Sequence, residues 1–273
     1  MSGRRRLTFI TYLLAISIFL LTVSGDGSVI LGRLGSMHAE KAGAAEYSAL
    51  SSRTERTLMA GTPWETELYI ISSPNDGPTL MVTGGIHGDE PAGYLAADEI
   101  ATWAIDRGTL LVLPRANVPA IASRTRNAPG GPDLNRIFPG DKNGVKTGKL
   151  AAEILAVVDE FQPEWVIDLH EAENFELLLR GALGQTFIYP DNSVSEDIVF
   201  EMLTAVNRTI MLEEYHFILL RGMAGGSLIE AAQMRGADAL IIETCTQMAL
   251  SERIKFHRQV VSSLLYLLEI AVY

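Results

Sequence analysis

Hydrophobic and polar positions divide this chain into an uncharged N-terminal run, a weakly periodic stretch and a long region of alternating patterns. In the long region, short apolar runs typical of buried strands alternate with stretches in which hydrophobic residues recur every three or four positions, as in amphipathic helices. Predicted strands cover residues 67–73, 78–84, 109–114, 164–169, 186–189 and 239–243. Predicted helices cover residues 92–107, 149–161, 195–213 and 250–268. An unusually long loop runs from the third strand to about Gly144.

Near-continuous apolar strands separated by helices predict the α/β class. We expect a mixed, largely parallel sheet with helices on both faces. In such sheets, ligands bind outside the carboxyl ends of the strands. Polar residues that follow the predicted strands are therefore the first candidates for function.

The N-terminal run has the pattern of an export signal. Three arginines precede the run Leu7–Val23, which contains no charged residue, and small polar residues follow. This order predicts a cleaved signal peptide or an apolar anchor helix over residues 1–24, with the arginines inside the cytoplasm. A Gly-, Ala- and Ser-rich stalk over residues 25–55 would then join it to an extracytoplasmic domain at residues 56–273.

Composition limits the chemistry. The 273 residues are 48% hydrophobic and 20% charged, which is enough for a substantial core. A net charge of -11 argues against a basic nucleic-acid surface. Because Cys245 is the single cysteine, neither a disulfide framework nor a thiolate zinc cluster is available. Any metal would be held by His and carboxylate side chains.

Three such side chains follow predicted strands. His87 and Glu90 stand three positions apart after the strand that ends at Gly84, and His170 follows the strand 164–169. Together they form a two-His, one-carboxylate set, which suits a catalytic zinc with a position left for water. Asp168 faces the same side of its strand as His170 and could accept the second ring proton of a ligating histidine.

Two further groups add candidate chemistry. Glu243 closes an apolar strand, where a carboxylate either turns to solvent or has a task, such as taking a proton from a metal-activated water. The long loop contains Arg124, Arg126, Asn135 and Arg136. Arginines suit carboxylate recognition, so this loop indicates an anionic substrate.

The ordered motifs resemble the zinc carboxypeptidase superfamily, and within it the succinylglutamate desuccinylase and aspartoacylase family. They are Gly-Gly-Ile-His-Gly-Asp-Glu at residues 84–90, Asp-Leu-Asn-Arg at 133–136, Asp-Leu-His at 168–170, and Glu243 at a strand end. The resemblance covers roughly residues 65–270. It implies a zinc carboxypeptidase-like fold and makes residues 56–273 a catalytic domain.

The resemblance also implies a role for each matched residue. His87, Glu90 and His170 match the ligands of one zinc ion per chain, and Glu243 matches the general base and acid. Arg126 matches the arginine that stabilises the oxyanion, with Arg124 as its rival. Asn135 and Arg136 match the pair that holds the substrate carboxylate. The tyrosine of the digestive carboxypeptidases has no assigned counterpart, although Tyr215 is possible.

We therefore expect a zinc-dependent hydrolase that cleaves an amide bond next to a carboxylate-bearing amino acid, as a carboxypeptidase does, outside the cytoplasmic membrane. Its substrate would be a small peptide with a free carboxylate. A deacylase of N-acyl amino acids is the first alternative, and a zinc-stabilised peptide-binding module without catalysis is the second. No nucleic-acid partner is expected, and the membrane is a partner only if the N-terminal segment is retained.

Overall fold

The computed structural model describes residues 21–23, 29–31, 51–190, 195–222 and 225–273. The chain divides into two units, Met1–Glu46 and Tyr47–Tyr273. In the first unit, β1 (Leu21–Val23) pairs antiparallel with β2 (Val29–Leu31).

The predicted N-terminal apolar helix falls mainly outside the described residues. The last part of its range, Leu21–Val23, forms strand β1 rather than helix. Among the described helices, none combines the length and the apolar character that crossing a bilayer requires.

The second unit is built on an eight-stranded sheet with the order β3-β4-β6-β5-β7-β10-β8-β9. Its strands are β3 (Ser52–Leu58), β4 (Thr66–Ser72), β5 (Thr79–Gly84), β6 (Thr109–Leu113), β7 (Trp165–Ala172), β8 (Thr186–Tyr189), β9 (Ile218–Arg221) and β10 (Asp238–Cys245). The central strands β6, β5, β7 and β10 pair in parallel, whereas β3, β4 and β8 bring antiparallel pairings on either side. The prediction of a mixed, largely parallel sheet is confirmed.

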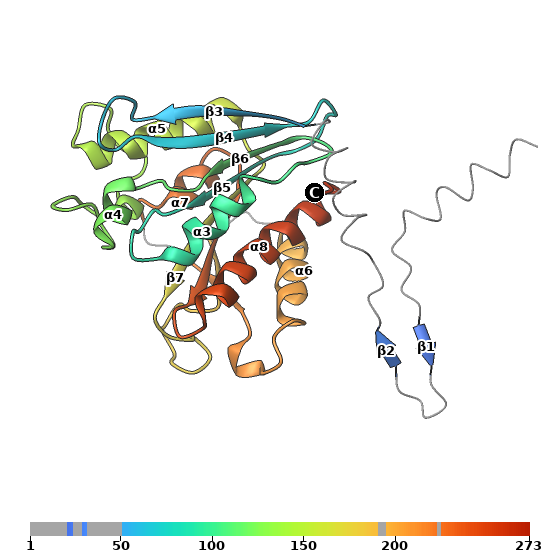
Figure 1. Ribbon diagram of the computed structural model, residues 1–273. Coiled ribbons are helices and arrows are strands. Elements are labelled where there is room, and N and C mark those ends of the chain that lie inside the picture. The colour runs from blue at the N-terminus through green and yellow to red at the C-terminus, as the bar shows by residue number, and fades with distance from the viewer. Residues whose placement is uncertain (1–20, 24–28, 32–50, 191–194, 223–224) are drawn as a thin grey trace, which may run out of the picture. The chain divides into compact units, whose positions relative to one another are not determined.

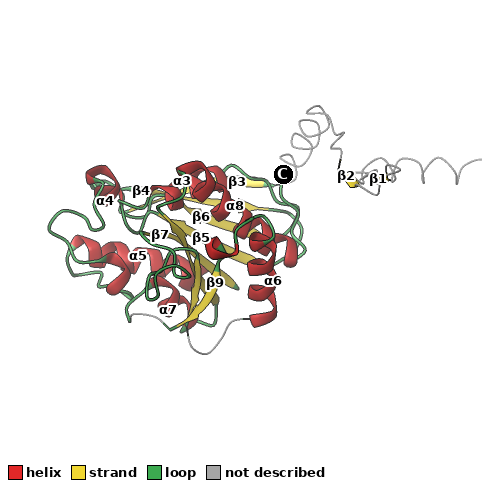
Figure 2. Ribbon diagram, turned by 90° about the horizontal axis from the view of Figure 1, so that it is seen from below, coloured by secondary structure: helices red, strands yellow, loops and turns green. Residues whose placement is uncertain are grey.

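Helices cover both faces of this sheet, as predicted (Figures 1 and 2). They are α3 (Pro91–Ile100), α4 (Val118–Ser123), α5 (Lys146–Phe161), α6 (Glu196–Asn207), α7 (Leu228–Gln233) and α8 (Leu250–Leu267), with 3-10 turns at Leu134–Arg136 and Glu213–Tyr215. On one face, α3, α6 and α8 pack together, and on the other face lie α5 and α7.

Alternation along the strands divides the core in two. Leu80 and Val82 of β5 join the cluster under α3, α6 and α8, whereas Met81 between them joins the cluster under α5 and α7. Successive side chains of a strand point to opposite faces. A strand covered on both sides is therefore a near-continuous apolar run, which explains why the sequence predicted the central strands.

Several element boundaries differ from the prediction. Strand β3 begins at Ser52, inside the range 25–55 assigned to the stalk. Helix α3 ends at Ile100 rather than Arg107, and within the remainder of the predicted range Ile105 forms an antiparallel bridge with Val272 near the end of the sequence. The helix predicted over residues 195–213 ends at Asn207. The short elements α4, β9 and α7 were not predicted.

Candidate metal centre

The turn after β5 brings His87 and Glu90 to the carboxyl end of the sheet. A Cβ on Gly88 would lie 2.0 Å from Ala120 O, so glycine allows this turn to pack directly on α4. Pro91 then occupies the first helical position of α3, which leaves Glu90 as the N-cap residue. The strand, the tight turn and the helix start therefore appear where the sequence predicted them.

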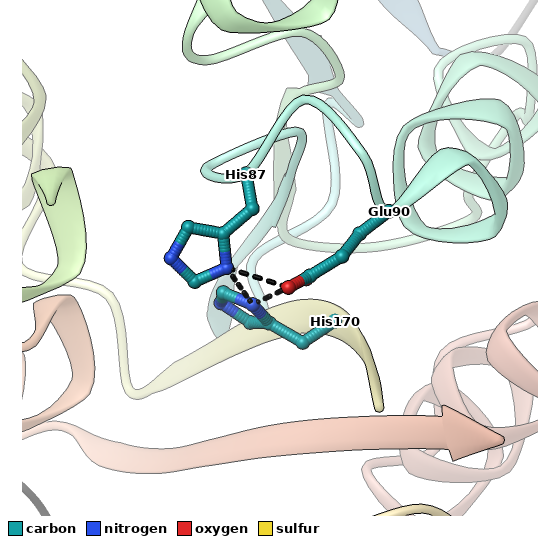
Figure 3. Close-up of side chains that lie close together, drawn as sticks. All are labelled: His87, Glu90 and His170. Carbon is teal, nitrogen blue, oxygen red and sulfur yellow. Dashed lines mark hydrogen bonds and ion pairs between the residues drawn. The ribbon is translucent and has the colours of Figure 1, made fainter. Parts of the chain in front are cut away.

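His170 reaches the same point from the neighbouring strand β7. Gly84, the last residue of β5, lies opposite Leu169 in the parallel pairing of β5 and β7, so the turn after β5 lies beside His170, which is within β7 rather than after it. Glu90 Oε1 lies 2.7 Å from His87 Nδ1, and Glu90 Oε2 lies 2.8 Å from His170 Nδ1. Figure 3 shows the three side chains pointing toward one another.

These three side chains have the donor set and the spacing of a metal site. One possible ligand atom from each lies within 4.8 Å of the others, and all three residues are buried. Asp133 Oδ1 lies 3.1 Å from His87 Nε2, and Asp168 Oδ2 lies 2.8 Å from His170 Nε2. Because a carboxylate accepts the Nε2–H, each neutral imidazole presents its Nδ1 lone pair to the shared centre. The residues thus fit a divalent cation.

Charges concentrate at this centre and shift its pKa values. Burial opposes charge on His170, but Asp168 and Glu90 outweigh it and raise its pKa well above the ordinary value. For His87, burial is likewise outweighed by hydrogen bonds to Asp133 and Glu90, which raise its pKa. Burial favours a neutral Glu90, yet the two histidines lower its pKa to about 2. The surrounding carboxylates thus favour positive charge at this centre.

Glu243 lies beside these ligands on β10. It is the register partner of His170 in the parallel pair β7–β10, and its residue is 7% exposed. Burial raises the pKa of Glu243 to about 7. Its Oε2 atom is buried without a hydrogen-bond partner among the described residues. Strand β10 continues to Cys245, so Glu243 lies within the strand rather than at its end.

A cavity of about 860 Å³ opens over the centre. Seven of the residues that the sequence predicted for the site lie in its wall, whereas Asp168, Arg124 and Tyr215 do not. Predicted site residues in the wall are His87, Glu90, Arg126, Asn135, Arg136, His170 and Glu243.

Arg126, and not Arg124, contributes to the cavity wall. Arg126 donates from Nε and Nη2 to Asp133 Oδ2 at 3.1 and 3.0 Å, and its Nη1 lies 3.4 Å from Glu90 Oε1. Asp133 thus holds the Arg126 guanidinium so that its Nη1 atom faces the carboxylate of Glu90. Arg124 instead forms the left-handed C-cap of α4, with φ of 53°.

The pair Asn135 and Arg136 is held in place by the backbone around it. Asn135 Oδ1 accepts a hydrogen bond from Leu228 N at 3.0 Å, and its Nδ2 lies 3.3 Å from His170 Nε2. Arg136 donates from Nη1 to Asn135 O at 2.7 Å. Both side chains line the cavity.

Sequence reasoning gave no role to several residues that the structure brings to the site. Asp133 opens the Asp-Leu-Asn-Arg motif, and its position two residues before Asn135 could have indicated a role in the site. The sequence around Glu171, which directly follows His170, did not indicate a role for it, because its partners come from α3 and α8.

Tyr215 packs on Phe175, with ring centroids 4.7 Å apart, and is not part of the cavity wall.

Comparison with known proteins identifies the family. A model of the succinylglutamate desuccinylase/aspartoacylase catalytic domain matches residues 76–265. Over 99 residues, 35% of this chain, the sequence is 38% identical to the N-alpha-acetyl-L-2,4-diaminobutyric acid deacetylase of Halomonas elongata. The match covers 29% of that protein.

Solved structures share the fold at low sequence identity. Product-bound Csd4, a cell shape determinant protein from Helicobacter pylori, has a TM-score of 0.66 and 20% identity, over 72% of this chain and 52% of that chain. EutE (DoeB), an ectoine utilization protein from Ruegeria pomeroyi, has a TM-score of 0.63 and 20% identity, over 81% of this chain and 67% of that chain. The described chain thus spans about half the length of Csd4.

Proposed function

Because the chain belongs to the succinylglutamate desuccinylase/aspartoacylase catalytic-domain family, we propose that it is a zinc-dependent hydrolase of an amide bond next to a carboxylate-bearing amino acid. One observation carries this proposal. His87, Glu90 and His170 converge in a cavity whose wall also contains Glu243 and Arg126.

The metal would be held by Nδ1 of His87, Nδ1 of His170 and the carboxylate of Glu90. Two histidines and one carboxylate are a ligand set of catalytic zinc sites. Zinc in such a site supplies Lewis acidity that polarises a carbonyl group and activates water.

The remaining residues move protons and stabilise charge. Glu243 takes a proton from the attacking water at its unpartnered oxygen and delivers it to the leaving nitrogen. Arg126, held by Asp133, stabilises the negative charge that develops on the scissile carbonyl oxygen. Arg136, with the amide of Asn135, binds the carboxylate of the substrate.

Two substrate classes fit this chemistry. A small peptide with a free carboxylate suits a carboxypeptidase-like reaction, and solved structures of similar fold include an mDAP-bound Csd4 described as a D,L-carboxypeptidase and a tripeptide-bound form. The relative from Halomonas elongata is instead a deacetylase of an N-acetylated amino acid, which favours the second class, N-acyl amino acids. Incubating the zinc-loaded protein with both classes and measuring the released amino acid distinguishes them.

Replacing Glu243 tests the mechanism. We expect Glu243→Gln to bind zinc as the wild type does but to hydrolyse the best substrate about 10²- to 10⁴-fold more slowly, since general acid–base catalysis is lost. Zinc content and initial rates measure the two effects. His170→Ala should lose both zinc binding and hydrolysis.

Two results would contradict the assignment. Wild-type rates in Glu243→Gln would remove that residue from catalysis. A wild-type protein that binds peptides tightly and releases them uncleaved after long incubation with zinc would favour the zinc-stabilised peptide-binding module.

The location outside the cytoplasmic membrane is part of the proposal. Its support is the sequence order of Arg4–Arg6 and the uncharged run Leu7–Val23. The membrane would be a partner only through that segment.

A further inference from the structure

Glu171 is a buried charge that the proposed reaction does not use. It follows His170 on β7, and its side chain is 0% exposed. Burying a carboxylate is costly unless it is paired and hydrogen-bonded. One oxygen of Glu171 is paired with Arg253 of α8, whose Nε donates to Met248 O at 3.1 Å.

The other oxygen of Glu171 is bound to the start of α3. Pro91 lacks an N–H, so Ala92 carries the first free N–H of the helix. Ala92 N donates to Glu171 Oε2 at 2.7 Å, and Ala92 is fully buried. Such an N–H is ordinarily satisfied by the side chain of the N-cap residue.

Glu90 is that N-cap residue, and its side chain makes no capping bond. Its carboxylate is directed instead at His87 and His170. The N–H of Glu171 donates to Glu90 Oε2 at 3.1 Å. Glu171 and the start of α3 therefore exchange two hydrogen bonds, as the two partners of a capping box do within one helix.

We infer that Glu171, held by Arg253, supplies from β7 the capping hydrogen bond that the side chain of the N-cap residue Glu90 does not make, and that this frees the Glu90 carboxylate to bind the metal. The inference rests on the proposed function. Glu171 also lies in the cavity wall, but in this role it acts through Glu90, so it is a positioning residue. A negative charge at a helix N-terminus also interacts favourably with the helix dipole.

The consequence is a competition for Glu90. Without an acceptor at position 171, the buried N–H of Ala92 has no partner. The carboxylate of the N-cap residue, Glu90, is then the group in position to accept this hydrogen bond. A Glu90 carboxylate drawn back to its own helix would leave His87 and His170 with a poorer third ligand.

Substitutions at Glu171 and Arg253 test this in the full chain. Glu171→Met keeps the length of the side chain but removes the acceptor, and we expect it to raise the zinc Kd about 10- to 100-fold, as outer-shell changes do. Glu171→Gln keeps an oxygen for Ala92 and should lose less. The Kd is measured by competition with a chromogenic chelator. Amide hydrogen exchange at Ala92 in the metal-free protein should be faster in Glu171→Met than in wild type.

A control on the same helix separates this role from general stability. Asp98 of α3 forms an ion pair with Arg115 at 2.6 Å and is not part of the cavity wall. Asp98→Asn should therefore keep the wild-type zinc Kd. If Glu171→Met does not fold, Arg253→Met replaces it, with a weaker zinc affinity and faster exchange at Ala92 expected.

The outcomes distinguish this inference from the proposed function. A folded Glu171→Met, or its replacement Arg253→Met, that binds zinc as tightly as wild type would overturn the inference alone. A wild-type protein that binds no zinc would overturn both. Equal losses in Asp98→Asn and Glu171→Met would reduce Glu171 to a purely structural residue.

Discussion

Two buried histidines in this molecule differ in the groups at their ring nitrogens. His170 has Asp168 and Glu90 as partners, and these carboxylates raise its pKa well above the ordinary value despite burial. His257 of α8 is equally buried, and its Nε2 lies 3.1 Å from Thr244 Oγ1. Burial, followed by the charge of His170, lowers the pKa of His257 to about 3. The carboxylates around His170 thus favour positive charge at that position, whereas His257 has no such partner among the described residues and remains neutral at neutral pH.

His257 should make the fold sensitive to acid. In the unfolded chain a histidine takes up a proton near its reference pKa of about 6.5, whereas His257 in the folded chain does so only near pH 3. Its contribution to stability is therefore fully present above about pH 6.5 and is lost progressively as the pH falls toward about 3. We expect His257→Gln to show a shallower fall of unfolding free energy between pH 6 and 4, measured by urea denaturation of metal-free protein. Parallel slopes for variant and wild type would contradict this.

At the level of elements, the close approach of α3 to β7 sets the distance between Glu90 and His170. Gly93 makes this approach possible, because a Cβ at that position would lie 2.4 Å from Leu169 O. The same helix begins at the turn that holds His87. One helix thus aligns ligands that come from two strands.

Gly93→Ala should therefore disturb both stability and the metal site. The added methyl group meets the backbone of β7, and overpacking of this kind costs about 1–3 kcal/mol. We expect a lower unfolding free energy and a weaker zinc affinity, measured by denaturation and chelator competition. In Gly148→Ala the new Cβ would have its nearest neighbour at 3.6 Å, so this control in α5 should keep the wild-type zinc affinity. Equal behaviour of the two variants would contradict the packing argument.

At the level of the whole molecule, the unit Tyr47–Tyr273 contains the complete sheet and both hydrophobic clusters. The candidate site also lies wholly within it. The first unit contributes no residue to these described features. The hydrophobic cores and the candidate metal centre therefore lie in the second unit, whereas the predicted export segment lies in the first.

Removal of residues 1–46 tests this division. We expect the fragment 47–273 to fold and to bind zinc with the affinity of the full chain, since its cores are intact. If the export segment is retained as an anchor, the full chain should remain with washed membranes whereas the fragment is recovered in the soluble fraction. Loss of zinc binding in the folded fragment, or recovery of the full chain only in the cytoplasm, would contradict the respective prediction.

The fold class followed from the sequence because central strands buried on both faces are apolar throughout, and that pattern is local. The edges of the fold did not follow from it. Strand β3 is largely exposed and charged, so it has no apolar signature. Strand β9 contains the apolar run Ile218–Leu220, but a run this short does not distinguish a strand from a buried helix segment by pattern alone. Part of the range predicted as helix α3 instead places Ile105 in a bridge with Val272, a contact that no local pattern contains.

The sequence by itself determined the candidate ligands, since His87 and Glu90 follow one strand, His170 belongs to another, and the chain offers few other histidines. Only the tertiary structure decided how those ligands are supported. The sequence matched Arg126 to the oxyanion role and left Arg124 as its rival; in the structure Arg124 is the left-handed C-cap of α4, and Arg126 lies in the cavity wall. Glu171 meets the start of α3 and Arg253 across separations of 79 and 82 positions. Sequence spacing gives only the order of residues along the chain, whereas the partners that stabilise a buried charge come from segments that are distant in sequence and meet only in the folded protein.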